Sequence, residues 1–179
     1  MLLRRLRLAA RAEDGAVTIP TVIWLPIFFL ILFFGLEMMF ISFRQVLLDH
    51  AVDVTTRELR LGTATLDTHD ELKAAVCTAM HFVPDCEANM AVEVFPVDTD
   101  TWSLTNTNGI LCTDSTSTEV LNPEINRGGS NQMVVMRACL KMPPLTTIDP
   151  LSRAMMTDAS GRFALTSVTV FVNEPRATN

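Results

Sequence analysis

Apolar and polar positions follow three successive patterns along this chain, and the first is a long apolar run. Val17 to Leu36 are twenty consecutive residues without a charged side chain. A helix rises ~1.5 Å per residue, so a run of this length spans roughly 30 Å, the thickness of the hydrocarbon core of a bilayer. A buried core helix can be equally apolar, but so long an uninterrupted run is more typical of a membrane-spanning helix. The pattern therefore predicts one transmembrane helix near the N-terminus.

A helical pattern continues beyond this run, from Arg44 to Leu61. Its apolar stripe consists of Val46, Leu47, Val54 and Leu61, thickened by Leu48, Ala51, Val52 and Leu59. No Pro or Gly interrupts the segment before Gly62, which would end a helix as a left-handed C-cap. We therefore predict one continuous helix from about Thr18 to Leu61, whose outer half packs one apolar face on a small domain.

The third pattern combines a short helix with alternating segments. Thr68-His-Asp-Glu71 is a capping box, which predicts a second helix that Pro84 ends. Alternation of apolar and polar residues then predicts strands, the first of them half exposed to water, at Met90–Phe95, Met133–Met142 and Arg162–Asn173, with a short fourth strand near Ile110–Cys112. The Thr-, Ser-, Asn- and Gly-rich residues 99–131 read as a long loop. Helices followed by strands favour an α+β domain with a small antiparallel sheet of three or four strands.

Charge is distributed unevenly on the two sides of the apolar run. Four arginines precede the run against Glu13 and Asp14, so this head carries +2; because the whole chain carries −6, the remainder carries −8. Positively charged flanks stay in the cytoplasm, so we expect the N-terminus inside and residues from Arg44 onward outside. The acidic remainder argues against nucleic acid as a partner and against docking on anionic lipid. No small-x-small cleavage site follows the run, so it is expected to remain as an anchor.

All four cysteines follow the apolar run. An even number of cysteines on the oxidising side of a membrane predicts two disulfides. Three pairings are possible, and we favour Cys77–Cys86, which closes a short loop, with Cys112–Cys139, which closes a longer one. A metal site is disfavoured because the sequence has no C-x-x-C pair and no His near Cys112 or Cys139.

No arrangement of residues in the sequence indicates catalysis. His50, His69 and His81 lie on or beside predicted helices, no serine lies in a G-x-S-x-G turn, and no glycine-rich loop follows a strand. The acids are spread singly, as on solvated faces. Glu37 is either a membrane-buried acid with a role or an acid at the outer lipid interface whose carboxylate reaches water, and we favour the second reading. We therefore expect neither an enzyme nor a cofactor.

Four features coincide: a short basic head, a glycine before an apolar helix, the outward extension of that helix, and a small sheet domain. This plan resembles that of type IV pilin-like proteins, and within them the TadE/TadG-like family of the tight-adherence (Tad, or Flp) pilus system. The resemblance is carried by EDGAVTIPTVIWLPIFFLILFFGLEMMF (13–40), by the outer helix with Arg44, Gln45 and Arg57, by MVVMRACLKMP (133–143) and by RFALTSVTVFVNEPR (162–176). It covers most of the chain, and the DGAVT-plus-WLP pattern is more specific than the strands.

The resemblance implies a minor pseudopilin or a membrane-tethered assembly factor. In the TadE type, a prepilin peptidase cuts after a glycine, here Gly15, and leaves Ala16 as the new N-terminus. The fifth residue of the mature chain is normally a Glu that pairs with the freed amine of a neighbouring subunit, but here it is Pro20. Glu37 cannot replace it, because seventeen helical residues place it ~25 Å away. The chain is thus expected either to be cleaved without entering a filament in the usual way or to remain uncleaved.

These inferences divide the chain into a cytoplasmic head or leader (1–15), a transmembrane helix (16–43) and a periplasmic α+β domain with two disulfides (44–179), anchored in the inner membrane by a single pass. The expected partners are membrane lipid, other pilins or pseudopilins, the Tad secretion machinery and a prepilin peptidase. A competing interpretation is a membrane-anchored periplasmic binding or scaffold protein unrelated to pili. An anchored envelope enzyme is a third, for which the sequence offers no candidate residues.

Overall fold

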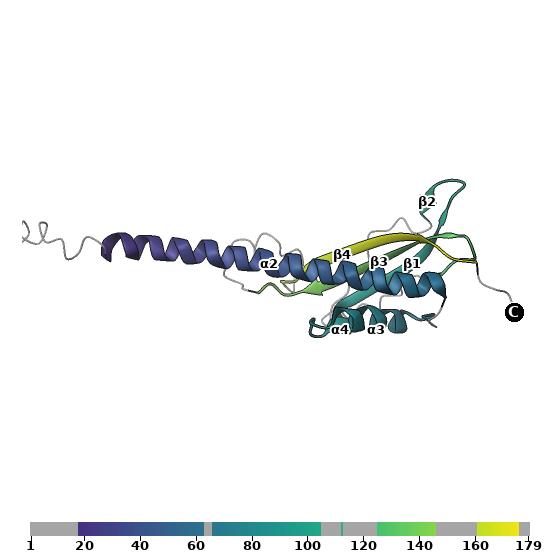
Figure 1. Ribbon diagram of the computed structural model, residues 1–179, viewed down its shortest axis with the longest axis horizontal. Helices are drawn as coiled ribbons and strands as arrows, with labels where there is room; N and C mark the ends of the chain where they lie inside the picture. Colours follow the sequence, from purple (N-terminus) through teal and green to yellow (C-terminus); the bar gives the residue numbers. More distant parts are fainter. Residues whose placement is uncertain (1–17, 63–65, 105–111, 113–124, 146–160, 176–179) are drawn as a thin grey trace, which may run out of the picture.

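The computed structural model describes residues 18–62, 66–104, 112, 125–145 and 161–175. Its elements are α2 (Thr18–Leu61), α3 (His69–Met80), α4 (Cys86–Asn89), β1 (Met90–Asp98), β2 (Ser103–Leu104), β3 (Met133–Met142) and β4 (Phe163–Val172). Figure 1 shows a long helical stem whose far half lies along a small head of helices and strands. We call residues 18–43 the stem, and the described residues from Arg44 onward the head. The predicted α+β class, with a long helix, a short second helix and a small antiparallel sheet, is confirmed.

The long helix α2 is unbroken over 44 residues, including Pro26 inside it. At ~1.5 Å per residue it is about 66 Å long. Gly62 follows with a φ of 65°, and its N–H donates to the Leu59 carbonyl. This is the left-handed helix end that the sequence predicts, and glycine adopts it without the steric cost of a side chain.

The face of α2 that packs on the head differs in part from the predicted stripe. Val46, Val54 and Leu61 are exposed, whereas the flanking residues are buried together with two threonines: Leu48, Ala51, Val52, Thr55, Thr56 and Leu59. The threonine hydroxyls are satisfied, because that of Thr55 donates to the Ala51 carbonyl over 2.9 Å and that of Thr56 to the Met136 sulfur over 3.4 Å. Leu48, Ala51, Val52 and Leu59 belong to the predicted stripe, whereas the two threonines do not, because an interpretation based on apolar residues alone passes over polar side chains.

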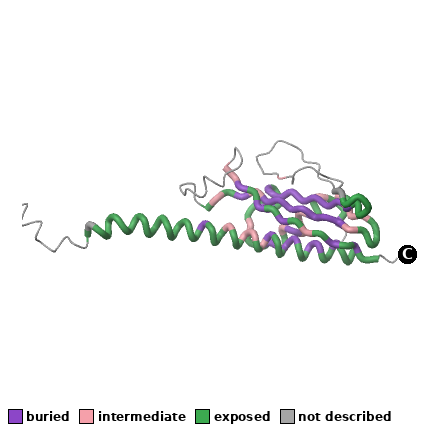
Figure 2. Tube along the Cα trace, turned by 90° about the horizontal axis from the view of Figure 1, so that it is seen from above, coloured by how far each residue is buried: buried purple, intermediate pink, exposed green. Residues whose placement is uncertain are grey.

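The sheet has the order β2-β1-β3-β4, and its neighbouring strands are antiparallel. One face, called here the inner face, packs against α2 and α3. The core on this side consists of aliphatic, Met and Phe side chains, including Leu48, Leu59, Leu72, Val76, Met80, Met90, Val92, Met136, Leu140, Leu165 and Phe171. Burying one such side chain fully stabilises a fold by ~1.5–3 kcal/mol. Figure 2 shows that burial is concentrated in the head, while the stem is exposed.

The opposite, outer face of the sheet differs between its strands. On β4 it is exposed, as alternation predicts: Val168, Val170 and Val172 are 54%, 56% and 45% exposed. On β1 and β3 it is buried, with Phe95, Val97 and Val135 forming a second small cluster. The expectation that β1 is half exposed to water is therefore wrong, because its outward side chains are covered as well. The strand expected near Ile110 lies outside the described residues.

Two short elements, α4 and β2, were not predicted. The sequence predicts that the second helix ends at Pro84, but α3 ends at Met80. A single helical turn, α4, then follows before β1. The strand β2 pairs only at Val97↔Leu104 and Asp98↔Ser103, so it extends a hairpin beyond the end of the three long strands. Elements of two and four residues are too short to produce a periodic pattern in sequence.

The capping box at the start of α3 forms as predicted. Glu71 N–H donates to the Thr68 hydroxyl, and the Glu71 carboxylate accepts from the Thr68 N–H. The next residue, His69, connects α3 to the sheet, because its Nε2 accepts a hydrogen bond from the Val92 N–H over 3.3 Å. Burial lowers the pKa of His69, nearby Lys73 lowers it further, and Asp70 raises it.

This contact makes the stability of the head depend on pH. A lowered pKa in the folded state means that folding resists protonation of His69, and the protonated ring cannot accept from Val92. The contribution of neutral His69 to the stability of the head is fully present at pH values above 6.5, the pKa of His69 in the unfolded chain. This contribution is lost as the pH falls below 6.5 toward the lower pKa of the folded state. We expect the thermal midpoint of the wild-type protein to fall more between about pH 7 and pH 5 than that of His69→Gln, which keeps an acceptor that does not titrate. Near-UV circular dichroism in detergent measures this, with the exposed His81→Gln as control; equal pH slopes for wild type and His69→Gln would contradict it.

Candidate functional site

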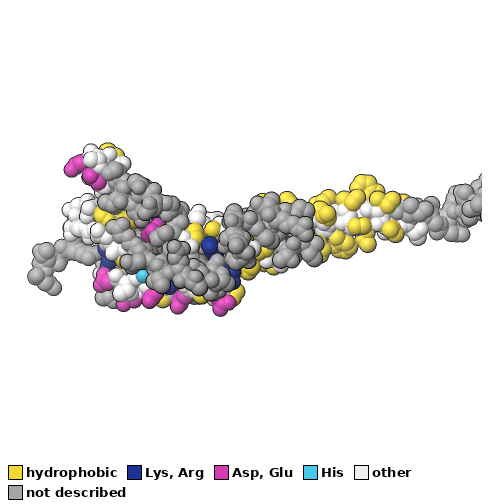
Figure 3. Space-filling model, turned by 180° about the vertical axis from the view of Figure 1, so that it is seen from behind, with side chains coloured by type: hydrophobic (Ala, Val, Ile, Leu, Met, Phe, Trp, Pro, Cys, Tyr) yellow, Lys and Arg dark blue, Asp and Glu magenta, His cyan; other side chains and the backbone are white. Residues whose placement is uncertain are grey.

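The stem exposes apolar side chains on every side. They run from Val22 to Phe43, and most are between about two-fifths and two-thirds exposed, as in Trp24 (66%), Phe28 (59%) and Met39 (55%). In Figure 3 the visible part of the stem is mostly hydrophobic, and the visible charged side chains lie on the head. The helix is long and apolar enough to cross a membrane. Only 6% of its apolar 18-residue segment is buried against the rest of the protein. A single-pass anchor is consistent with this surface.

Glu37 interrupts the apolar surface of the stem, but it does not reach water. The residue is 2% exposed, and its Oε1 accepts a hydrogen bond from the Leu145 N–H over 2.8 Å. The favoured expectation that this carboxylate is solvated at the lipid interface is therefore wrong. The reason is tertiary, because Leu145 lies 108 residues further along the chain and covers a position that is exposed in an isolated helix.

The outer half of α2 keeps an exposed stripe beside its buried face. Phe43, Val46, Val54 and Leu61 are 52%, 64%, 37% and 47% exposed. They continue the apolar surface of the stem along the head, with exposed His50 and Arg57 between them. Apolar residues in such a row on a helix suit contact with another helix. This surface is therefore a candidate for contact with a neighbouring subunit.

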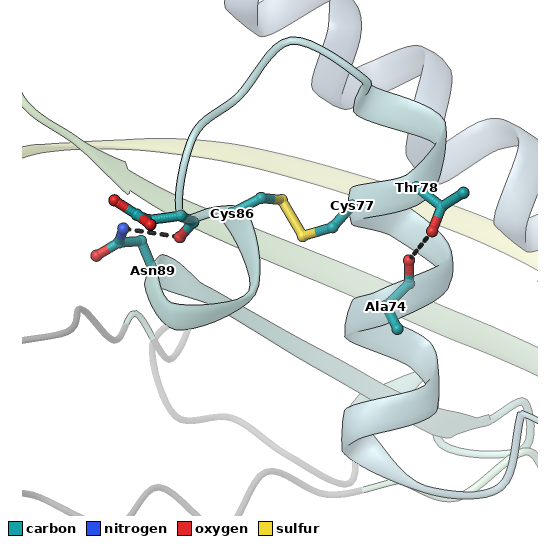
Figure 4. The surroundings of a disulfide bond; sticks show 6 residues. Ala74, Cys77, Thr78, Cys86 and Asn89 are labelled. Atoms are coloured by element: carbon teal, nitrogen blue, oxygen red, sulfur yellow. Dashed lines mark hydrogen bonds between the residues drawn. A yellow bond between two sulfur atoms is a disulfide. The ribbon is translucent and has the colours of Figure 1, made fainter.

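Two disulfides brace the head, and they are the pairings favoured from the sequence. Cys77 of α3 is bonded to Cys86 of α4, and Cys112 to Cys139 of β3. Figure 4 shows the first, which holds the single turn α4 against α3, while the Asn89 side chain donates to the Asp85 carbonyl over 2.9 Å. The second places Cys112 at the outer face of the sheet, because Cys139 lies there beside Arg137 and Val135. The first bond therefore joins two helices, and the second joins Cys112 to a strand of the sheet.

An ion pair is buried on the outer face of the sheet. Glu93 and Arg137 are directly opposite in the register of β1 and β3, and they are 1% and 8% exposed. Their charged atoms approach to 4.0 Å, and the Arg137 guanidinium lies 4.7 Å from the centre of the Phe95 ring. The sequence analysis expects the acids on solvated faces and does not indicate this pair, because only the register of two strands far apart in sequence places the two residues together. Removing one partner alone would leave a buried charge, so the pair fixes this register.

The end of the head furthest from the stem carries a hairpin and a groove. The Asp98 carboxylate accepts from the N–H groups of Asp100 and Thr101 and from the Thr101 hydroxyl, and these bonds shape the hairpin between β1 and β2. Its Trp102 is 74% exposed and has a φ of 51°. An open groove of about 470 Å³ lies between this hairpin and the turn before β3, with Asp98, Asp100 and Asn131 in its lining.

The structure does not gather the histidines into a reactive arrangement. His50 and His81 are exposed, and His69 makes the contact with β1 described above. Within the described ranges, no group of three or more His, Cys, Asp or Glu side chains is positioned to hold a metal ion. Pro20 is exposed in the first turn of α2, whereas Gly15 and Ala16 lie outside the described residues.

Comparison with known proteins adds no relative to this description. No family model, no curated protein and no solved structure matches the chain. The resemblance to TadE/TadG-like proteins therefore remains a prediction, which depends on the residues that carry it and on the arrangement of stem and head.

The two disulfides should contribute unequally to stability. The Cys112–Cys139 bond spans 27 residues and the Cys77–Cys86 bond 9, so loop-closure entropy favours the first by ~1 kcal/mol. We expect Cys112→Ser/Cys139→Ser to lower the free energy of unfolding by ~2–5 kcal/mol and to reduce abundance, and Cys77→Ser/Cys86→Ser to cost less. Urea unfolding of both double variants measures the difference. Labelling of four free thiols in the non-reduced wild-type protein would contradict the prediction.

Proposed function

We propose that this protein is a non-enzymatic component of Tad (Flp) pilus biogenesis, acting as a minor pseudopilin or a membrane-tethered assembly factor. One observation carries the proposal: a single unbroken helix, α2, is apolar and exposed along its first half and packs along a small disulfide-braced α+β head with its second half. This is the plan of the pilin-like proteins that the sequence resembles.

The exposed surfaces support a role in assembly. The apolar stripe from Phe43 to Leu61 would lie beside neighbouring helices that stand in the same membrane with the same orientation. Within the described residues, no cleft gathers acid and base groups of the kind that catalysis requires. The proposed partners are therefore other pilins or pseudopilins and the Tad secretion machinery, together with membrane lipid around the stem.

A second candidate function is that of an anchored periplasmic binding or scaffold protein unrelated to pili. The distal groove and the exposed Trp102 favour it, because the hairpin at the end furthest from the stem offers both an open groove and an exposed aromatic side chain. The genes that neighbour this one separate the two proposals. A secretion ATPase, a prepilin peptidase and further small pilins beside it would support the first.

The proposed topology places the N-terminus in the cytoplasm and the head in the periplasm. Four arginines before the apolar run, together with two disulfides after it, motivate this orientation. We expect alkaline phosphatase fused after Asn179 to be active. An inactive fusion, with a cytoplasmic reporter active at the same position, would reverse the topology.

The leader hypothesis concerns Gly15. If a prepilin peptidase cuts after it, Gly15→Val should block processing, because a bulky side chain fills the space that the close approach of the backbone requires. Gly15→Ala is the matched control with a small side chain and should be processed better than Gly15→Val. Mass spectrometry of the membrane-extracted protein distinguishes a chain that begins at Ala16 from one that is heavier by residues 1–15. Wild-type protein that keeps residues 1–15 in cells with an active peptidase would favour the uncleaved assembly factor.

Pro20 is expected to determine whether the mature protein enters pilus filaments. Pro20→Glu leaves the cut site unchanged and supplies a carboxylate that could pair with the freed amine of a neighbour. We expect this variant to be processed normally and to be recovered from sheared pilus fractions more than the wild type, which should stay mostly in the membrane fraction. Abundant wild-type protein in sheared filaments would show that the missing Glu is unimportant.

A further inference from the structure

A short strap leaves the sheet and runs down the stem. It consists of Pro143, Pro144 and Leu145, directly after β3 ends at Met142. The guanidinium of Arg44 donates to the Pro143 carbonyl over 3.4 Å, and the Leu145 N–H donates to Glu37 over 2.8 Å. Arg44 and Glu37 are seven residues apart on α2, so the strap descends ~10 Å along the helix, away from the head. Figure 1 shows this segment extending from β3 beside the stem.

Leu145, the last described residue of the strap, lies at the level where the apolar run of α2 ends. Glu37 directly follows Leu36, the last residue of the charge-free segment. On both sides of this level α2 still exposes apolar side chains, with Leu36 at 36%, Met38 at 45% and Phe43 at 52%. If α2 spans a bilayer, the strap therefore lies at the boundary of the hydrocarbon rather than in bulk water.

The backbone of the strap is suited to a position at the boundary of the hydrocarbon. Irregular backbone is tolerated in lipid only where its polar groups have partners, because an unsatisfied N–H there costs several kcal/mol. Pro143 and Pro144 have no N–H, and the single N–H of Leu145 is bonded to Glu37. The three residues therefore present no unsatisfied donor.

The apolar side chains of the strap face outward. Leu145 is 47% exposed and Pro143 is exposed as well, while Glu37 beneath them is 2% exposed. We propose that the strap is a second membrane contact of this protein, in which Pro143 and Leu145 rest among the lipids of the outer leaflet and Glu37 is the residue that positions them. The proposal depends on the membrane anchoring proposed above. It would fix the height and the rotation of the head on the membrane, because the head would meet the bilayer at two points.

The two natural tryptophans provide internal controls for a test in the full-length protein. Trp24 lies in the stem, and Trp102 lies on the distal hairpin. Three single-tryptophan proteins are compared in bilayers of phospholipids brominated on their acyl chains, which quench tryptophan at short range: Trp102→Phe, Trp24→Phe, and Leu145→Trp with both natural tryptophans replaced by Phe. We expect strong quenching of Trp24 and of the Leu145→Trp protein, and none of Trp102.

The possible outcomes distinguish a failure of the membrane anchoring from a failure of the proposed lipid contact of the strap. If Trp24 is not quenched, α2 does not span the bilayer and the anchoring itself is wrong. If Trp24 is quenched while the Leu145→Trp protein is quenched only by aqueous acrylamide, the strap lies in water and this inference is overturned with the anchor intact. Protection of the Leu145→Trp protein from both quenchers would show that a second copy of the chain covers the strap, which also overturns it.

The role of Glu37 is tested in the same Leu145→Trp background. Glu37→Gln keeps a side-chain oxygen that accepts from the Leu145 N–H, so quenching by the brominated lipid should be retained. Glu37→Leu removes the acceptor, so the strap should leave the lipid and become accessible to acrylamide. Far-UV circular dichroism and the count of free thiols verify that the head is folded in both. Equal lipid quenching in the two variants would show that Glu37 does not position the strap.

Discussion

The arrangement of this protein depends on one unbroken helix that meets two different surroundings. Between its first and last turns, α2 pairs its backbone groups within the helix except at Pro26, which has no N–H, so its side chains decide most of what it contacts. Along the stem they are apolar all round, and along the head only one face is buried. Because the same helix serves both halves, the head cannot rotate or tilt relative to the stem without breaking helical hydrogen bonds or core contacts. A rigid stem therefore sets the position of every surface on the head.

The head is small, and it gains rigidity from several kinds of contact. Its inner core joins both helices to the sheet, while the outer face carries a buried ion pair, a small aromatic and aliphatic cluster, and the Cys112–Cys139 bond. A domain of this size buries a modest share of its surface, so covalent cross-links contribute a larger fraction of its stability than they would in a larger protein. Such a head suits the oxidising side of a membrane.

The two ends of the head offer different chemistry. The end near the stem combines apolar exposed side chains with a backbone strap whose donors are removed or satisfied, which suits contact with lipid. The distal end combines the acids of the hairpin, an exposed tryptophan and an open groove, which suits contact with soluble or protein partners. Along the side, the exposed stripe of α2 connects the two ends. A protein that stands upright in a membrane among similar neighbours would use these surfaces separately, and this division agrees with the proposed role in pilus assembly.

The sequence by itself determined the elements that depend on local interactions. The limits of α2, its glycine end, the capping box at Thr68 and the position of β3 all follow from residue period, backbone freedom and side-chain hydrogen bonds within a few positions. The favoured cysteine pairs are also the ones the structure contains. Only the tertiary structure showed that the buried face of α2 includes Thr55 and Thr56, whose hydroxyls donate to the Ala51 carbonyl within the helix and to the Met136 sulfur across the core. It alone placed Glu93 opposite Arg137, and it alone brought Leu145 to Glu37, because sheet register and the return of the chain after β3 depend on pairings between residues far apart in sequence.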